Sequence, residues 1–253
     1  MLHNKKGLII GLANNSSIAW GIAQAAHREG AELGFTYLND ALAKRVTPLA
    51  QSLGSDLILP CDVNDDQQID AMAAAIKERW GKLDFVVHAV AFAQRQDLQG
   101  NISATSREGF RIALETSAYS LIAVARALTP LMTEGGSMLT LTYYGSEKVV
   151  PNYNIMGIAK AALECSVRYL ACELGEKNIR VNAISPGAIK TLSAKGIADF
   201  NSMLSASKER APLHRNVTPS DVGELAAFLL SDRAASITGD IIYLDGGYNL
   251  LGF

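Results

Sequence analysis

The chain has 253 residues, of which 49% are hydrophobic and 19% are charged. A chain of this length can bury about 70% or more of its unfolded surface, which excludes a disulfide-stapled miniprotein and a disordered chain. Its 23 basic and 25 acidic residues give a net charge of −2 and form no basic run, which argues against a nucleic-acid binder.

Short apolar runs and helical stretches alternate from one end of the chain to the other. Taken in chain order, they predict strands over residues 7–11, 31–37, 57–61, 85–89, 137–143, 180–185 and 241–244. They predict helices over residues 18–30, 40–53, up to 80, 108–131, 152–175 and 221–231. This alternation predicts a single α/β domain over residues 1–253, a Rossmann-type, doubly wound fold with a seven-stranded parallel sheet and helices on both faces. A ligand is expected beyond the carboxyl ends of the strands.

The loop after the first predicted strand has the composition of a phosphate-binding turn. Gly11 and the small Ala13 permit a tight turn and a close approach of the backbone to a ligand. Ser17 is expected to cap a helix that starts at Ile18, where free N–H groups suit a pyrophosphate. The usual G-x-G-x-x-G pattern is absent, so an ordinary glycine turn with a helix cap remains an alternative.

Two polar residues after later strands have competing interpretations. Asp62 follows the third predicted strand, where its carboxylate could bond an adenine amino group or cap the next helix. His88 lies in the apolar run FVVHA, which favours a hydrogen-bonded core histidine over a catalytic acid or base.

The stretch YYGSEKVVPNYNIMGIAK, from Tyr143 to Lys160, contains the strongest sign of catalysis. Tyr153 and Lys160 are seven residues apart, so on a helix they face the same way within about 20°. Tyr143 ends the preceding strand and would face the same cleft. A nearby ammonium lowers the pKa of a tyrosine, so Tyr153 is expected to donate a proton or hydrogen bond near neutral pH. Two half-buried packing tyrosines and a solvated lysine are the alternative.

The three cysteines and one uncharged stretch bear on the compartment. Cys165 and Cys172 lie about 10 Å apart on a helix, too far for a disulfide, and with Cys61 they have no metal-ligand spacing. We therefore expect buried, reduced thiols in a cytoplasmic protein, and no metal site. Residues 7–26 carry no charge, but several polar residues interrupt them, which argues against a membrane span or a signal peptide.

Six stretches of the sequence point to a known family: GLANNSSIAWGIA (11–23), REGAELGFTY (28–37), CDV (61–63), PNYNIMGIAKAALE (151–164), VNAISPGAIKTLSAKGI (181–197) and YLDGGY (243–248). Through them the chain resembles the short-chain dehydrogenase/reductase superfamily over essentially its whole length. More narrowly, it resembles the NADH-dependent enoyl-[acyl-carrier-protein] reductases of bacterial fatty acid synthesis. Ordinary ketoreductases of the superfamily have a tyrosine where this chain has Met156 and a serine where it has Tyr143.

The resemblance implies a homotetramer that uses NADH to reduce the trans-2 double bond of an enoyl-acyl-carrier-protein thioester. It implies catalytic roles for Tyr143, Tyr153 and Lys160. It implies cofactor contacts from Gly11, Ala13, Ser17, Ile18, Leu38, Asp62, Val63, Val90, Lys160, Ile189, Lys190, Thr191, Leu192 and Ser193. Substrate contacts are expected from Ala93, Tyr143, Tyr153, Phe200 and Met203.

The end of the second predicted strand bears on the choice of cofactor. Residues 37–40 read YLND, with no arginine immediately beyond them to bind a 2′-phosphate, so NADH is expected over NADPH. Lys44 and Arg45 lie one helical turn later and could still reach that phosphate.

A mobile lid over the acyl chain is expected at about residues 188–210. Phe200 and Met203 belong to a group of apolar residues at helical spacing with no obvious packing partner near the cleft. A plain surface helix is the alternative. An acidic carrier protein would dock near the cationic residues of this region, which are Lys190, Lys195, Lys208 and Arg210.

Other functions also stay open. One is another short-chain reductase, acting on ketoacyl or enoyl-coenzyme A thioesters, and another is a dinucleotide-binding protein without catalysis. The chain departs from the branch at Leu38, where a polar residue is common, and at residues 89–91, where Ala-Val-Ala replaces Ser-Ile-Gly. The intact Tyr143, Tyr153 and Lys160 argue against a binding module, which needs no such set.

Overall fold

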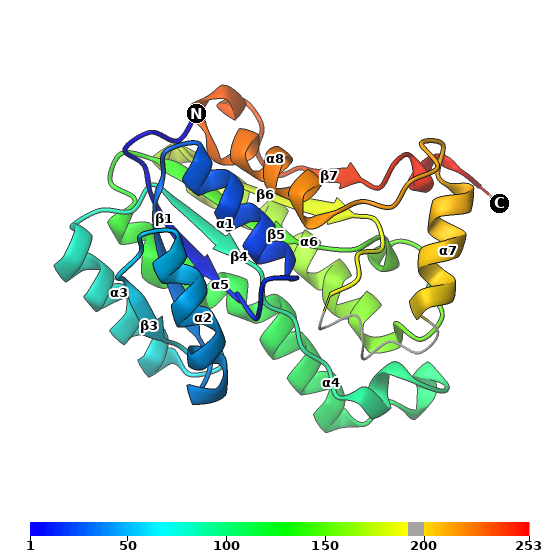
Figure 1. Ribbon diagram of the computed structural model, residues 1–253. Coiled ribbons are helices and arrows are strands. Elements are labelled where there is room, and N and C mark those ends of the chain that lie inside the picture. Colours follow the sequence, from blue (N-terminus) through cyan, green and yellow to red (C-terminus); the bar gives the residue numbers. More distant parts are fainter. Residues whose placement is uncertain (192–199, 253) are drawn as a thin grey trace.

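Seven parallel strands form one sheet in the order β3-β2-β1-β4-β5-β6-β7, so the predicted doubly wound α/β fold is confirmed (Figure 1). The structure is a computed structural model that describes residues 1–191 and 200–252. The strands are β1 (Lys6–Ile10), β2 (Glu32–Tyr37), β3 (Ile58–Pro60), β4 (Phe85–His88), β5 (Gly136–Leu141), β6 (Ile179–Pro186) and β7 (Ile241–Leu244). Successive strands are added toward one edge of the sheet from β1 to β3 and toward the other edge from β4 to β7. The switch point lies between β1 and β4, which pair in the middle of the sheet.

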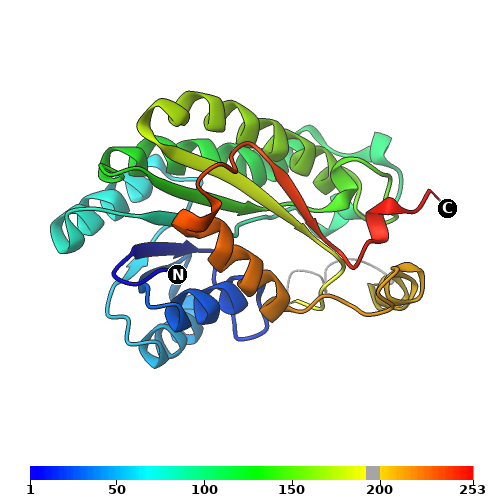
Figure 2. The same ribbon diagram turned by 90° about the horizontal axis from the view of Figure 1, so that it is seen from above.

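Helices cover both faces of the sheet in two layers (Figure 2). The helices are α1 (Ile18–Arg28), α2 (Asp40–Ser52), α3 (Asp66–Trp80), α4 (Arg107–Leu114), α5 (Ser120–Leu128), α6 (Asn154–Leu174), α7 (Phe200–Arg210) and α8 (Pro219–Leu230). Local capping begins several of them. Asp65 accepts from two backbone N–H groups at the start of α3, and Thr218 and Asp221 form a reciprocal capping box at the start of α8.

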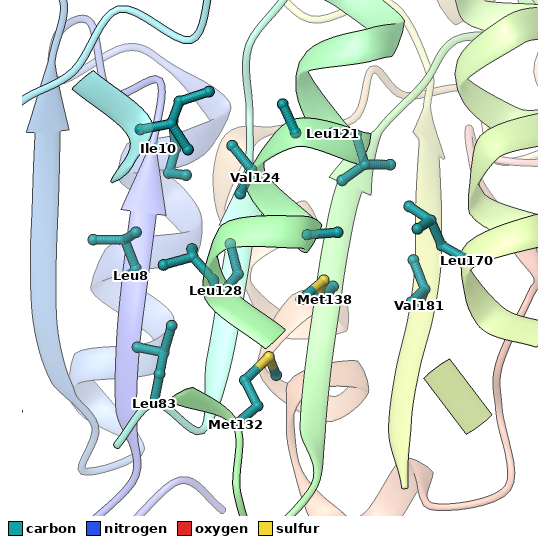
Figure 3. Close-up of a cluster of buried hydrophobic side chains, with 14 of the residues drawn as sticks. Leu8, Ile10, Leu83, Leu121, Val124, Leu128, Met132, Met138, Leu170 and Val181 are labelled. Carbon is teal, nitrogen blue, oxygen red and sulfur yellow. The ribbon is translucent and has the colours of Figure 1, made fainter. Parts of the chain in front are cut away.

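Each face of the sheet has its own hydrophobic core. Against one face, α3, α5 and α6 pack on alternate strand residues such as Leu8, Met138 and Val181, with Leu128 and Leu170 from the helices (Figure 3). Against the other face lie α1, α2 and α8. The sheet is therefore buried on both sides, which explains why its strands read as continuous apolar runs.

The first and last long helices of this second layer lie in close contact. A Cβ atom on Gly21 of α1 would lie 2.1 Å from the carbonyl oxygen of Pro219, and one on Gly223 of α8 would lie 2.4 Å from the carbonyl oxygen of Gly21. Only glycine allows the two backbones to approach this closely. The N-terminal and C-terminal parts of the chain thus complete one core together.

Two sequence-based expectations differ from the structure. The helix predicted over residues 108–131 is interrupted by a π-helical turn, Glu115–Tyr119, between α4 and α5. Cys61 is buried as expected, but Cys165 and Cys172 are exposed on α6, because they lie on the face of that helix turned away from the sheet. Within the described ranges, no helix is both long and apolar enough to cross a membrane.

Candidate active site

A cavity of about 790 Å³ lies at the carboxyl ends of the central strands, where the topology predicts the ligand site. Its lining contains predicted site residues from the loops that follow β1, β2, β3 and β4, from α6 and from the segment after β6. The predicted site residues that line it are Gly11, Ala13, Ser17, Ile18, Leu38, Asp62, Val63, Val90, Ala93, Tyr143, Tyr153, Lys160, Ile189, Thr191, Phe200 and Met203.

The turn between β1 and α1 has the shape expected of a phosphate-binding loop. Gly11 has a φ of +97°, and a Cβ atom there would lie 2.3 Å from the carbonyl oxygen of Ala89, so only glycine fits. Ser17 is the N-cap residue of α1, but the expectation that its hydroxyl caps the helix is wrong, because that hydroxyl donates to the carbonyl oxygen of Asn14 at 2.7 Å. Since no side chain of the described residues caps α1, its first N–H groups are available to the pyrophosphate of a dinucleotide.

Asp62 does not cap the helix that follows it. Its carboxylate accepts from the backbone N–H and the side-chain amide of Asn64, at 2.9 and 3.0 Å, whereas Asp65 caps α3. The carboxylate of Asp62 therefore stays at the cavity wall. This position suits the bond to an adenine amino group that the sequence suggested.

His88 is a core histidine, as predicted. It is buried at the end of β4, with Nδ1 3.1 Å from the hydroxyl of Thr140 and Nε2 2.8 Å from that of Ser120. Burial, reinforced by the charge of Lys160, lowers the pKa of His88 to about 3. The ring is therefore neutral at physiological pH, and both of its nitrogens have partners.

Tyr143 and Tyr153 meet edge to face, with ring centroids 5.1 Å apart. Tyr153 is only 8% exposed and stands at the N-cap of α6, between Asn152 and Asn154, which have left-handed φ angles of 62° and 34°. A Cβ atom on Gly145 would lie 2.5 Å from the ring of Tyr153. The turn that contains Gly145 therefore packs directly on this ring and fixes its position.

The expectation that Lys160 lowers the pKa of Tyr153 is wrong. Burial raises the pKa of Tyr153 well above its usual range, and Tyr143 and Glu164 raise it further. Burial, with Tyr248 and Asp245 nearby, raises the pKa of Tyr143 to about 12. Both phenols therefore stay protonated near neutral pH, and each can donate a hydrogen bond.

Lys160 is buried rather than solvated, so the alternative of a surface lysine is wrong. Its ammonium donates to the carbonyl oxygen of Leu141, at the end of β5, over 2.8 Å. Burial lowers the pKa of Lys160 to about 8, although the negative charge of Glu164 acts in the opposite direction. Glu164 is itself buried and accepts a hydrogen bond from Thr142 at 2.5 Å.

The segment predicted as a lid is described only in part. Ile189 and Thr191 line the cavity, whereas Lys190 is exposed and is absent from its lining. Leu192, Ser193 and Lys195 lie outside the described residues. The lid stays a prediction, and the structure adds that residues 200–210 form a helix whose Phe200 and Met203 face the cavity.

The π-helical turn Glu115–Tyr119 contributes to the site although no motif of the sequence pointed to it. Thr116 lines the cavity and donates to the side chain of Asn64, and Ser117 exchanges two hydrogen bonds with the backbone of Phe92, at 3.0 and 3.1 Å. Hydroxyl residues in an otherwise apolar helix were the available signal. Arg95, which also lines the cavity, gave no signal, because it lies outside every motif.

Comparisons with known proteins show which proteins this chain resembles. Residues 11–249 match the family model described as enoyl-(acyl carrier protein) reductase. An NADH enoyl-[acyl-carrier-protein] reductase of Rhizobium meliloti is 54% identical over 99% of this chain and 93% of its own length. One of Rickettsia typhi is 53% identical over 100% of this chain and 97% of its own.

Solved structures show the same similarity. The reductase of Anaplasma phagocytophilum, in complex with NAD, superposes with a TM-score of 0.95 and 50% identity over 100% of this chain and 94% of its own. That of Bacillus cereus, with NADP+ and an indole naphthyridinone, has a TM-score of 0.98 and 52% identity over 100% of this chain and 99% of its own.

Proposed function

Because the chain belongs to the enoyl-[acyl-carrier-protein] reductase family, we infer that the protein reduces the trans-2 double bond of enoyl thioesters in this cavity. The protein is an NADH-dependent oxidoreductase of fatty acid synthesis. The observation that best supports our assignment of the reacting groups is that Tyr143, Tyr153 and Lys160 line one cavity with the glycine turn after β1.

We propose that the strand ends hold the cofactor along the cavity. The uncapped first turn of α1 and Gly11 would receive the pyrophosphate, Asp62 the adenine, and Lys160 the nicotinamide ribose. The other predicted residues that line this part of the cavity would complete the contacts. Once bound, NADH supplies the hydride that is added to C3 of the enoyl group.

Tyr153 would stabilise the charge that develops on the thioester oxygen. Its raised pKa keeps the phenol protonated, so from its buried position it can donate a hydrogen bond to the enolate oxygen. Tyr143, in edge contact with Tyr153, would hold the thioester and shape the pocket. A proton taken up from the solvent would then form the C2–H bond and complete the reduction.

The position of Tyr153 favours enoyl over ketone reduction. Met156 occupies the tyrosine position of ordinary ketoreductases and lines the cavity, so no phenol stands there. In an enoyl thioester the charge develops on an oxygen remote from C3. A donor displaced by about one helical turn, roughly 5 Å, matches that longer reach. Ala93, Phe200 and Met203 would contact the acyl part of the substrate.

We propose that the protein works in the cytoplasm as a homotetramer. The outward face of α6 supports self-association, because Ile158 and Tyr169 on it are 42% and 76% exposed, and Cys165 and Cys172 are exposed as well. Exposed apolar patches of this kind commonly mark protein–protein contacts. The acyl-carrier-protein thioester is the expected partner at the cavity.

A substrate panel tests the proposed function. Purified protein should oxidise NADH when crotonyl or longer enoyl thioesters are added. With matched ketoacyl thioesters, kcat/KM should be at least about 10²-fold lower, the loss expected when no positioned donor is present. Efficient reduction of the ketoacyl thioesters, or no reaction with any enoyl thioester, would contradict the assignment.

A further inference from the structure

Arg95 is the exposed cation in the wall of the active-site cavity. Among the residues that the structure describes, three acidic or basic side chains line that cavity: Asp62, Arg95 and Lys160. Asp62 follows β3, and Lys160 is buried with its ammonium on a backbone carbonyl. In the described part of the chain, the guanidinium of Arg95 has neither an ion pair nor a hydrogen bond.

The backbone that carries Arg95 is fixed relative to Tyr153. Arg95 opens a short 3-10 turn that ends at Leu98, and Leu98 packs in one cluster with Tyr153 and Met156. The side-chain amide of Asn154, next to Tyr153, donates to the carbonyl oxygen of Gly100 at 3.0 Å. The backbone of the turn that begins at Arg95 is therefore fixed by its contacts with the start of α6.

A second contact holds the same turn against α4. Asp97 is 5% exposed, and one of its oxygens accepts from the backbone N–H of Ser106 at 3.4 Å. Its other oxygen lies so close to the first turn of α4 that a Cβ atom on Gly109 would be 2.1 Å away. This places a carboxylate at the positive end of a helix, which favours its negative charge, although this second oxygen has no hydrogen-bond partner among the described residues.

The place of Arg95 in the cavity distinguishes its ligand from the cofactor. Phe92 and Ala93, the neighbours of Arg95 in the chain, line the cavity together with Phe200 and Met203 of α7. The turns between β4 and α4 lie at the same end of the molecule as α7 (Figure 1). The pyrophosphate of a dinucleotide is expected elsewhere, at α1 after β1.

We propose that Arg95 binds the phosphate of the pantetheine arm that carries the substrate thioester. The inference rests on the proposed function, because an acyl-carrier-protein thioester ends in this phosphorylated arm. When the thioester lies at Tyr153, the pantetheine arm attached to it must leave the cavity. We expect it to pass the part of the cavity lined by Ala93, Phe200 and Met203, next to the unpaired Arg95. A guanidinium suits this ligand, since its planar fork of N–H donors can bind two phosphate oxygens at once.

Two substrates that differ only in the phosphate test the proposal. Crotonyl-pantetheine and crotonyl-4′-phosphopantetheine are compared in the wild type, Arg95→Gln and Arg95→Lys. In the wild type the phosphorylated substrate should have an about fivefold lower KM, as a partly exposed charge pair allows. Arg95→Gln should remove this difference, whereas Arg95→Lys should keep part of it. Added salt should weaken the wild-type preference.

Two further substrates identify the molecule that supplies the phosphate, and a second arginine variant provides the control. Crotonyl-acyl-carrier-protein should lose affinity in Arg95→Gln as the phosphopantetheine thioester does. A loss confined to crotonyl-coenzyme A would assign Arg95 to the nucleotide phosphates of that molecule and overturn the proposal. Arg107→Gln, in an exposed arginine outside the cavity lining, should leave the KM values of all four crotonyl thioesters unchanged.

Failure of this inference can be separated from failure of the proposed function. If the wild type reduces the enoyl thioesters but Arg95→Gln affects the two pantetheine substrates equally, only the role of Arg95 is wrong. A raised KM for NADH in Arg95→Gln would also overturn it, since Arg95 would then serve the cofactor. A wild type that reduces no enoyl thioester would instead contradict the proposed function.

Discussion

The ionisation of single residues around the cavity is set mainly by burial. Loss of solvent raises the pKa of Tyr153 beyond its usual range and that of Cys61 to about 11, and it lowers that of Lys160 to about 8. The phenol and the thiol are therefore uncharged at neutral pH, so Cys61 is a poor nucleophile despite its place in the cavity lining. Of these three groups, Lys160 changes its charge closest to physiological pH.

Replacing Tyr153 by Phe tests whether the phenol donates a hydrogen bond without being required for hydride addition. Tyr153→Phe should lower kcat for a crotonyl thioester by only part of the roughly 10²–10⁴-fold loss typical of a positioned proton donor. The KM for NADH should stay the same. Tyr119→Phe, in an exposed tyrosine, is the control. A loss beyond 10⁴-fold would mean that proton transfer from Tyr153 is obligatory.

The lowered pKa of Lys160 predicts how cofactor binding depends on pH. Below about pH 8 the side chain is charged and can donate to the ribose, whereas above it the ammonium loses its charge. The KM for NADH should therefore rise as the pH increases through 8, and steady-state kinetics between pH 6 and pH 10 will show it. A flat profile would argue that Lys160 does not bind the ribose.

Lys160→Met should weaken cofactor binding and stabilise the fold. The pKa of Lys160 in the folded chain, about 8, lies below the 10.5 of an exposed lysine, a difference of about 3 kcal/mol against folding when the residue is charged. This penalty is complete below pH 8 and disappears as the pH rises toward 10.5. After loss of the bond to Leu141, the free energy of unfolding at pH 7 should still increase by about 1–3 kcal/mol. Unchanged NADH affinity would contradict the assignment.

At the scale of elements, the π-helical turn Glu115–Tyr119 connects one helix to the ends of several strands. Its Thr116 bonds to Asn64 after β3, and its Ser117 bonds to the backbone of Phe92 after β4. Ser120, directly after the turn, lies 2.8 Å from the ring of His88. The turn therefore holds the loops that shape both the cofactor and the substrate part of the cavity.

Ser117→Ala tests this arrangement. The change leaves the backbone N–H and carbonyl of Phe92 without their partner, which should lower the free energy of unfolding by about 1–3 kcal/mol. The KM for the enoyl thioester should rise more than that for NADH, because Phe92 precedes the substrate residue Ala93. Urea unfolding and kinetics measure the two effects. A larger rise for NADH would show that the loop serves mainly the cofactor.

Much of the fold could be predicted from the sequence, because strand–helix alternation is a local pattern, and most of the residues expected at the site do line the cavity. Tyr143 and Lys160 gather because their elements reach the same edge of the sheet. The hydroxyl residues of the π-helical turn were a signal in the sequence, but their partners lie far away in the chain and could not be predicted. The rise in the pKa of Tyr153 could not be predicted either, because it results from burial of the phenol in the complete fold.

At the scale of the whole molecule, the outward face of α6 predicts the assembly. Tyr169 is 76% exposed there, so Tyr169→Glu should place a charge in the interface of the proposed homotetramer and shift the protein to smaller species. Light scattering after size exclusion measures the mass. Val149→Glu, at an exposed apolar residue of a loop, is the control. A wild type that is monomeric would contradict the tetramer.

The contact between α1 and α8 has a consequence for synthesis on the ribosome. The apolar face of α1, which ends at Arg28, is covered by a helix that begins only at Pro219. At about 5–20 residues per second, the chain between them takes on the order of 10–40 s to be translated. During that interval the nascent chain exposes a surface that chaperones bind. Released chains that end before Pro219 should therefore be captured by a chaperone more strongly than the released full-length chain.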